Sequence, residues 1–538
     1  MTDDLSAAAD RRQSHLRRTR RTFHAMTALA LVVAGAAVGT AAMAADPPTT
    51  NQQEQGMHPG RPFHDPVNAD SDAKHNVNIT LDSTRTQFEV GGKKVYGASW
   101  TGSFVAPTIR VKPGDTLTVH LVNNLPVATN LHFHGLHVSP QGQSDDPFLC
   151  VAPGASTTYT LAIPADHPQG TFWYHSHAMG TSCSDSGMSG MSGMAGTSGT
   201  AGTNDMPFMP GDVENQISDG LSGALIVGDD RTLLPADLQQ ITAHTLVLKD
   251  AQVGTDNHLV QNTAAGAIDS NAPTVRTVNG QLRPVLSMRP NETQLWRLVN
   301  AGADIFYQLQ LDGYRFTVVG EDGTPVSQVT TADTLLLPPG KRYDVLVTAN
   351  GNPGRTTLRT LAYSNGPDGD SYPDTELATV NVAGHSEHRL PLPTGGMPTA
   401  PADLSAVPVA QHRDLVLSEK EEDSQFFING KQFAMGTSVF DTPAKLGTVE
   451  EWTITNAADE DHPFHLHTTA FQVVSINGVP QPYTHRQDTV PVPHEQNGVP
   501  GKVVIRINFA DYEGAWMFHC HIAAHEDNGM MSFINVVR

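Results

Sequence analysis

The chain has 538 residues, a formal net charge of −22 at pH 7 and 16% charged residues. Its length exceeds what one hydrophobic core usually organises and suggests three to four domains. The acidic balance argues against a nucleic-acid partner, because sequence-independent phosphate contacts need a basic face. Its 47 Gly and 37 Pro separate many short apolar stretches, which favours turn-rich, all-β domains over long amphipathic helices.

Residues 1–44 have the pattern of an export signal. Six arginines precede residue 22, an Ala/Val/Leu run begins at Ala25, and Ala42-Met43-Ala44 offers a cleavage site with small residues at 42 and 44. Residues 19–23 resemble a twin-arginine signal, which predicts use of the twin-arginine export machinery and a periplasmic or extracellular protein. An uncleaved membrane anchor is the alternative, although the Ala/Gly content makes the run weakly hydrophobic.

Beyond the signal, residues 45–76 are polar and rich in Pro, so we expect a tether or irregular lead-in with structure starting near Val77. From there two patterns recur three times in the same order, a turn with a strand ending in Asn and a Pro-Gly turn with alternating apolar residues. These repeats predict three β-sandwich domains. We place them at 77–230, 231–400 and 401–538. The first pattern starts at Lys112, Arg289 and Lys445, and the second follows Pro153-Gly154, Pro339-Gly340 and Pro500-Gly501.

A third repeat occurs only in the outer two units. It reads GTFWYHSH from Gly170 and GAWMFHCH from Gly514, whereas the middle copy from Gly354 has no histidine. This distribution predicts a metal site where the first and third domains meet. The middle domain is then expected to act as a spacer that lets its neighbours close on each other.

Ten histidines and one cysteine gather in four short clusters. Residues two apart in a strand face the same side, so each H-x-H pair presents two imidazoles together. Imidazole suits copper, iron, nickel and zinc, so one pair alone fits a zinc or structural site equally well, whereas four symmetric pairs are a strong signal. The clusters are His132 and His134; His175 and His177; His462, His465 and His467; and His519, Cys520, His521 and His525.

Strand alternation separates Cys520 from its two neighbours. His519 and His521 face one side and Cys520 the other, so the thiolate is expected to serve a different metal. One Cys and two His with a weak axial Met form the ligand set of blue-copper electron-transfer sites, whereas zinc would favour a closed tetrahedron. A buried, inert cysteine is the alternative reading. The partners proposed for Cys520 are His462, His525 and Met530.

The other two cysteines, Cys150 and Cys183, form the one remaining candidate disulfide. Sequence does not show whether their Cα atoms lie within bonding distance. The pairing therefore stays open at this point.

The four clusters resemble the copper-binding motifs of the multicopper oxidase family, to which laccases, bilirubin oxidases and bacterial cuprous oxidases belong. The resemblance covers roughly residues 77–538. It implies three cupredoxin-like, Greek-key sandwiches and an oxidoreductase with four copper ions. The implied ligands are His462, Cys520 and His525 with axial Met530 for type 1; His132 and His465 for type 2; His134, His175 and His521 for one type 3 copper; and His177, His467 and His519 for the other.

The family mechanism implied by this resemblance runs from a small-molecule reductant to O2. Single electrons enter at the type 1 copper, pass through Cys520 into its neighbouring histidines, and reduce oxygen to water at the three-copper cluster. Asp145 resembles the family's acid near that cluster, and Glu526 resembles the channel acid of bacterial members. Both could instead be ordinary surface carboxylates. Asp146 stands where Gly is usual, which could shift Asp145.

An insert over residues 178–215 departs from the family pattern. In relatives the HSH motif is closely followed by a strand, which we expect here to open at Gln216. The insert is rich in Gly, Ser and Met, and its thioethers could hold Cu(I), although an incidental disordered loop is the alternative. We expect a monomer with laccase-like activity on phenols or aryl amines. Oxidation of Cu(I) is the rival activity, and a relative with dead sites is the non-enzymatic alternative.

Overall fold

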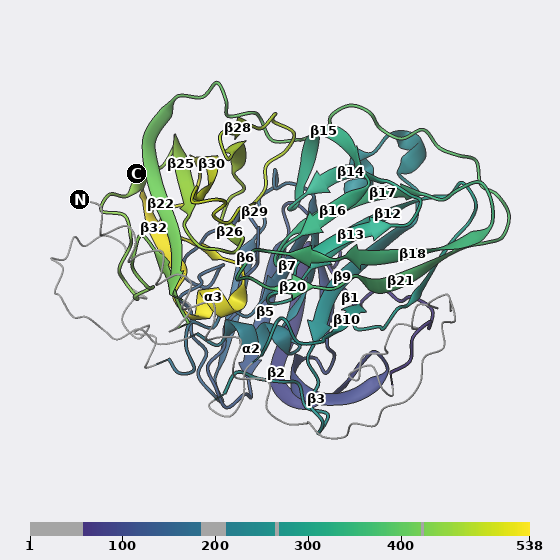
Figure 1. Cartoon of the computed structure of the whole chain (residues 1–538), viewed down its shortest axis with the longest axis horizontal. Helices are drawn as coiled ribbons and strands as arrows, with labels where there is room; N and C mark the ends of the chain where they lie inside the picture. Colours follow the sequence, from purple (N-terminus) through teal and green to yellow (C-terminus); the bar gives the residue numbers. More distant parts are fainter. Residues whose placement is uncertain (1–56, 184–210, 264–267, 421–423) are drawn as a thin grey trace, which may run out of the picture. The chain divides into compact units, whose positions relative to one another are not determined.

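The computed structural model describes residues 57–183, 211–263, 268–420 and 424–538 (Figure 1). Within these ranges the chain is nearly all strand, with two short α-helices, α2 (Val213–Ser218) and α3 (Ala523–Asp527). No helix in the described part is long and apolar enough to cross a membrane. The predicted signal at 1–44 and the insert methionines Met188, Met191, Met194, Met206 and Met209 lie outside the described residues.

The first pair of sheets has the strand orders β3-β2-β5-β6 and β1-β4-β8-β7. Leu81 and Leu117 of one sheet and Ile109 and Leu225 of the other are fully buried in a common core. In β2 and β5 the buried residues alternate with more exposed ones, as the two-residue period of a strand predicts, whereas β8 is buried along its whole length. The strands are β1 (Asn68–Asp70), β2 (Asn76–Val90), β3 (Lys93–Trp100), β4 (Ala106–Val111), β5 (Thr116–Asn123), β6 (Ser156–Ala162), β7 (Gly170–His175) and β8 (Ser222–Val227).

The lead-in is ordered well before Val77, so the expectation of structure only from that residue is wrong. Met57 is buried, and β1 pairs in parallel with β4. Asp65 contacts the second domain: its carboxylate lies 2.9 Å from His244 Nδ1 and accepts from the Thr245 backbone N–H at 2.6 Å. Polar residues that looked like a tether therefore bind backbone and side-chain groups of the folded domains.

The second pair of sheets has the orders β10-β9-β12-β17-β14-β15 and β11-β21-β18-β13-β16, with a separate two-stranded β19-β20. Trp296 and Tyr307 are buried in its core. Short 3-10 helices, η4 (Asp230–Leu233) and η5 (Ala236–Leu238), precede the first strand. The strands are β9 (Ala243–Ala251), β10 (Val275–Val278), β11 (Val285–Met288), β12 (Thr293–Asn300), β13 (Tyr307–Leu311), β14 (Phe316–Glu321), β15 (Thr324–Ala332), β16 (Thr334–Leu337), β17 (Arg342–Thr348), β18 (Gly354–Leu361), β19 (Tyr363–Ser364), β20 (Ser371–Tyr372) and β21 (Thr375–Val382).

The third pair has the orders β23-β22-β25-β30-β27-β28 and β24-β32-β31-β26-β29. Its buried residues, including Trp452 and Phe518, belong to the same continuous cluster as those of the second pair. The two domains therefore share one apolar interior. The strands are β22 (Val409–Lys420), β23 (Gln425–Ile428), β24 (Ala444–Lys445), β25 (Thr448–Asn456), β26 (His462–Leu466), β27 (Gln472–Ile476), β28 (Val479–Pro480), β29 (Thr489–Val492), β30 (Gly501–Phe509), β31 (Gly514–Cys520) and β32 (Met531–Val537).

The repeated Asn ends equivalent strands in all three domains. β5, β12 and β25 end at Asn123, Asn300 and Asn456, and pair antiparallel with β6, β17 and β30 respectively. Each Asn is fully buried and its amide donates to two backbone carbonyls, which explains why the sequence pattern recurs. The acceptors are Val127 and Val151 for Asn123, Ile305 and Leu337 for Asn300, and Glu460 and Val492 for Asn456.

Two structural features lie at the two ends of the insert. Cys150 and Cys183 form a disulfide, with Cα atoms 5.7 Å apart. Gln216 lies in α2 and the strand begins only at Ser222, so the expectation of a strand from Gln216 is wrong. The backbone N–H groups of Val213 and Glu214 donate to the carboxylate of Asp527 in α3 at 2.9 Å each, which satisfies two donors in the first turn of α2. The two short helices lie close together (Figure 1).

Candidate metal centre

Eight of the histidines singled out in the sequence meet between the first and third domains. In the first domain, His132 forms an antiparallel bridge with His175 at the end of β7. In the third domain, β26 and β31 pair so that His465 is opposite His519. All eight are buried: His132, His134, His175, His177, His465, His467, His519 and His521.

The rings of the two domains interleave. His132 stacks on His467 with centroids 3.8 Å apart, and His134 stacks on His465 at 3.7 Å. Ring nitrogens also approach directly: His134 Nδ1 lies 3.1 Å from His521 Nε2. His467 Nε2 likewise lies 3.2 Å from His519 Nε2. The sheets therefore bring the four H-x-H pairs into one cluster.

This cluster has the donors that copper requires. Six of its eight histidines carry a ring nitrogen with no hydrogen-bond partner among the described residues. Burial lowers the pKa of most of these rings, which favours the neutral form that binds metal. Candidate ligand atoms lie within 4.8 Å of one another in overlapping sets. These sets are His132, His134 and His175; His132, His465 and His467; and His177, His467 and His519.

A second group of donors surrounds Cys520. Its Sγ lies 3.7 Å from His462 Nδ1 and 3.6 Å from His525 Nδ1. Met530 is fully buried, and its backbone pairs with those of Cys520 and His525. Burial raises the pKa of the Cys520 thiol well above its usual range, so a thiolate here needs a bound cation. The set suits copper bound by one thiolate and two imidazoles.

Cys520 joins the two centres. His519 and Cys520 are adjacent residues of β31, and His519 Nδ1 lies 2.8 Å from the Cys520 carbonyl oxygen. The Cys520 side chain contacts His462 and His525, whereas His519 and His521 contact the eight-histidine cluster. This arrangement agrees with the alternation predicted from the sequence.

Asp145 and Glu526 are both buried beside the eight-histidine cluster, so the alternative of surface carboxylates is wrong. One oxygen of Asp145 accepts from the Phe133 backbone N–H at 2.9 Å and lies 3.0 Å from His132 Nδ1. The Glu526 oxygens lie 3.2 Å from His177 Nε2 and 3.1 Å from His519 Nδ1. Neither Glu526 contact has hydrogen-bond geometry, so both oxygens stay unsatisfied by the described protein groups.

Two carboxyl groups that no sequence motif singled out lie at the outer edges of the Cys520 site. Glu460 Oε1 is 3.0 Å from His525 Nε2, and Glu419 Oε2 is 3.8 Å from His462 Nε2. Burial and the neighbouring Glu419 carboxyl raise the pKa of Glu460 to about 9. Glu460 stands two residues before His462, which was a usable signal in the sequence.

The middle domain also contributes to the site, contrary to its expected role as a spacer. Arg342 of β17 makes a two-pronged ion pair with Asp488, with both contacts at 2.7 Å. Asp488 Oδ1 in turn lies 3.0 Å from His134 Nε2. Burial raises the pKa of Asp488 to about 6, and the Arg342 guanidinium opposes that rise. The signal was Lys341-Arg342 after the second Pro-Gly turn, where the other two copies carry Ala-Ser and Lys-Val.

Comparison with known proteins follows the same division into three units. Family models described as multicopper oxidase match residues 82–197, 230–382 and 406–537. The multicopper oxidase MmcO of Mycobacterium tuberculosis is 25% identical, with 86% of this chain and 87% of that protein covered. A laccase of Bacillus subtilis is 26% identical, with 80% and 88% covered. The structure of a multicopper oxidase from Campylobacter jejuni, titled a metallo-oxidase, has a TM-score of 0.72 at 24% identity and covers 91% of this chain and 98% of that chain.

The likeness to solved structures shows the fold, three cupredoxin-like β-sandwich domains. The three family matches together span well over half of the sequence. The chain therefore belongs to the multicopper oxidase family, whose members are copper-dependent oxidoreductases that use oxygen.

Proposed function

We propose that the protein is a laccase-like oxidase that couples one-electron oxidation of phenols or aryl amines to the four-electron reduction of O2 to water. The observation that carries this proposal is the position of Cys520. Its sulfur faces His462 and His525, while the residues on either side of it, His519 and His521, belong to the eight-histidine cluster. One peptide segment thus joins a site for electron entry to a site large enough for several metal ions.

The proposed cofactors are four copper ions. When bound, they would supply one-electron redox chemistry at the Cys520 site and the accumulated electrons for oxygen reduction at the cluster. We assign their ligands as the family motifs imply, and the grouping of ligand atoms supports two of the four sets directly, the one around Cys520 and the one of His177, His467 and His519. Type 1 is held by His462, Cys520, His525 and axial Met530; type 2 by His132 and His465; one type 3 by His134, His175 and His521; and the other by His177, His467 and His519.

Asp145 and Glu526 are proposed to hold and move the protons that oxygen reduction consumes. Asp145 binds the outer nitrogen of His132, so it orients that ring while remaining close to the cluster. Glu526 lies between His177 and His519 with both oxygens free of described hydrogen-bond partners, which leaves them available to pass a proton inward. Their burial separates both acids from bulk solvent.

The test uses the copper-loaded, full-length protein. We expect an intense blue thiolate absorption and oxygen consumption with a substituted phenol, at four electrons per O2. Absence of either the blue band or oxygen uptake would exclude the enzymatic proposal. Release of hydrogen peroxide in stoichiometric yield would exclude the four-electron step.

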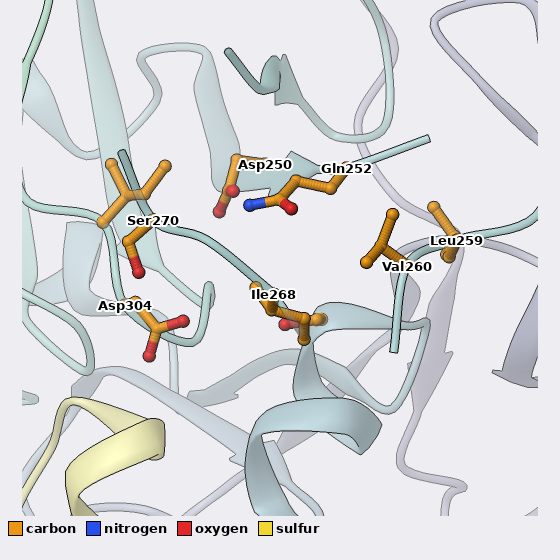
Figure 2. Close-up of a pocket in the computed structure, with 9 residues that line it drawn as sticks. Asp250, Gln252, Leu259, Val260, Ile268, Ser270 and Asp304 are labelled. Carbon is orange, nitrogen blue, oxygen red and sulfur yellow. The ribbon is translucent and has the colours of Figure 1, made fainter. Parts of the chain in front are cut away.

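Oxidation of Cu(I) is the second candidate, favoured by the acids around the Cys520 site. Glu460 and Glu419 touch its two histidines, and the electrostatic field of Asp370 reaches Glu460. Asp304 and Asp250 continue this acidic region and line a small cavity, where Figure 2 shows their carboxyl groups at its edge. A cation close to these acids would favour their charged, deprotonated forms and be attracted by them, whereas a neutral phenol gains no such interaction.

Two variants separate these substrates. Glu460→Gln removes an ionisable carboxyl group at the entry site, and deletion of residues 184–209 removes the Met-rich part of the insert. A selective loss of Cu(I) turnover in steady-state assays would favour metal oxidation. If neither change alters the steady-state rate on Cu(I) or on a phenol, the laccase-like activity is the better assignment.

Export through the twin-arginine machinery and a monomeric state remain proposals based on residues 1–44 and on the fold. Arg20→Lys with Arg21→Lys should retain the precursor in the cytoplasm of a bacterial host. Cell fractionation measures that block. Size-exclusion chromatography with light scattering measures the oligomeric state of the exported protein.

A further inference from the structure

His134 is oriented differently from other histidines of the cluster. Several rings have an oxygen beside Nδ1, which leaves Nε2 directed inward. In His134 the relation is reversed: Nε2 faces Asp488, and Nδ1 faces His521. The oxygens beside Nδ1 belong to the Asp145 side chain for His132 and to the backbones of Ser176, Asp488 and Cys520 for His175, His465 and His519.

Asp488 fixes this reversed ring. A carboxylate only accepts hydrogen bonds, so Nε2 of His134 carries the proton and Nδ1 keeps its lone pair. The backbone oxygen of Asp488 also accepts from His465 Nδ1 at 2.8 Å. One residue thus sets opposite tautomers in two rings that stack on each other.

The middle domain holds Asp488 in place. Arg342 donates to both carboxylate oxygens, and its Nε donates to the Thr171 backbone oxygen of the first domain at 3.2 Å. Asp322 accepts from the backbone N–H groups of Asp488 and Thr489 at 3.2 Å each. The buried guanidinium therefore contacts all three domains and keeps the acid oriented.

Gly340, at the second Pro-Gly turn, brings the middle-domain backbone against the same rings. A Cβ at this position would lie 2.9 Å from His521 Cδ2 and 3.0 Å from His134 Cε1. Its φ of +83° is also in the region that favours glycine. The turn thus encloses the pair of nitrogens that face each other across 3.1 Å.

We infer that Arg342 and Asp488 are positioning residues through which the middle domain sets the tautomer of His134, and so completes the type 3 site shared with His521. The inference rests on the proposed function in assigning these two rings to one copper. The middle domain is then part of the oxygen-reducing centre, although it supplies no ligand.

A matched control distinguishes this role from general stabilisation by a buried ion pair. Arg413 and Glu450 in the third domain form an equally buried, two-pronged pair at 2.7 and 3.0 Å. Arg413 also donates to backbone oxygens of Thr442 and Pro443, much as Arg342 binds nearby carbonyls. None of its described hydrogen bonds reaches a cluster histidine.

The experiment compares Arg342→Met, Asp488→Asn and Arg413→Met as copper-loaded, full-length proteins. Copper retained per chain is measured against increasing chelator, together with the blue band and the share of copper visible by electron paramagnetic resonance. For the first two variants we expect cluster copper to be lost at ~10- to 100-fold lower chelator concentration, as for other residues that orient metal ligands. The blue band should persist, and Arg342→Lys should restore part of the loss.

A second measurement needs no metal. In the copper-free protein with 15N-labelled histidine, we expect a ring signal protonated at Nε2, assigned to His134 by its absence in His134→Gln, and a shifted tautomer balance in Asp488→Asn. Wild-type copper retention in folded Arg342→Met and Asp488→Asn, an equal loss in Arg413→Met, or an unchanged tautomer would each overturn the inference. Failure of the proposed function would instead be evident in the wild type, as a missing blue band or missing oxygen uptake.

Discussion

The two candidate copper centres differ in how much of the chain each one needs. The donors around Cys520 all come from the third domain, within residues 462–530. The eight-histidine cluster takes four rings from the first domain and four from the third, and the middle domain braces it through Asp488. A local site tolerates changes at domain contacts, whereas a shared site depends on them. A substitution should therefore be able to disrupt one copper centre and leave the other intact.

The largest expected effect is that of Cys520→Ser. This change removes the thiolate at the entry site and the path into His519 and His521, so blue colour and turnover should both vanish. The cluster ligands are untouched, so most of its copper should remain. Absorption spectra with copper analysis check this expectation, and loss of all copper would show that the centres are less separable than their geometry indicates.

The next effect belongs to the cluster alone. Glu526→Gln keeps the shape of the side chain but cannot relay a proton as a carboxylate, and such groups typically contribute about 10²-fold or more to a rate. Turnover should fall by about that factor, with the entry site held reduced and therefore colourless during catalysis. Stopped-flow absorption during reoxidation by O2 measures the step. A fully blue steady state would place the block before the cluster instead.

Gly340→Ala tests whether the turn of the middle domain supports the cluster histidines. The new Cβ meets His134 and His521 and imposes strain at a positive φ, so we expect a destabilisation of about 1–3 kcal/mol. Some cluster copper should be lost with the blue band intact. Ala at Gly313, another positive-φ glycine with open space around its Cβ, controls for backbone strain alone. Equal copper loss in both variants would contradict the supporting role of the middle domain.

The smallest effects on the copper centres should come from the repeated asparagines. Asn456→Ala leaves the Glu460 and Val492 carbonyls without this donor, next to the entry site, whereas Asn123→Ala does the same in the first domain. Each should cost roughly 1–3 kcal/mol in the free energy of unfolding, from denaturant titration. Only Asn456→Ala should alter the blue band, and a change in Asn123→Ala would argue against a local entry site.

Sequence patterns were sufficient for what depends on neighbours along the chain. Strand alternation separated Cys520 from His519 and His521, and the Asn repeat located the equivalent strands of three domains. Motif resemblance pointed to Asp145 and Glu526, which the structure places beside the cluster.

What the sequence did not show depends on contacts between distant segments. Arg342 and Asp488 are 146 residues apart, and each alone resembles an ordinary charged residue. The sequence did not show that Gln216 lies in a helix. The carboxylate that accepts from the first turn of α2 belongs to Asp527, more than 300 residues later. The lead-in looked like a tether because its partners, including His244 and Thr245, belong to the next domain.

The wide separation of the cluster's parts also imposes an order of events on synthesis. His134 and Asp488 lie 354 residues apart, and His134 and His521 are 387 apart. A chain made from its N-terminus therefore has no complete cluster until all three domains exist and have docked. A histidine pair from one domain supplies only part of the donor set, so correct loading of the cluster must follow completion of the fold. Cells that supply copper to this protein would have to do so after the last strand is in place.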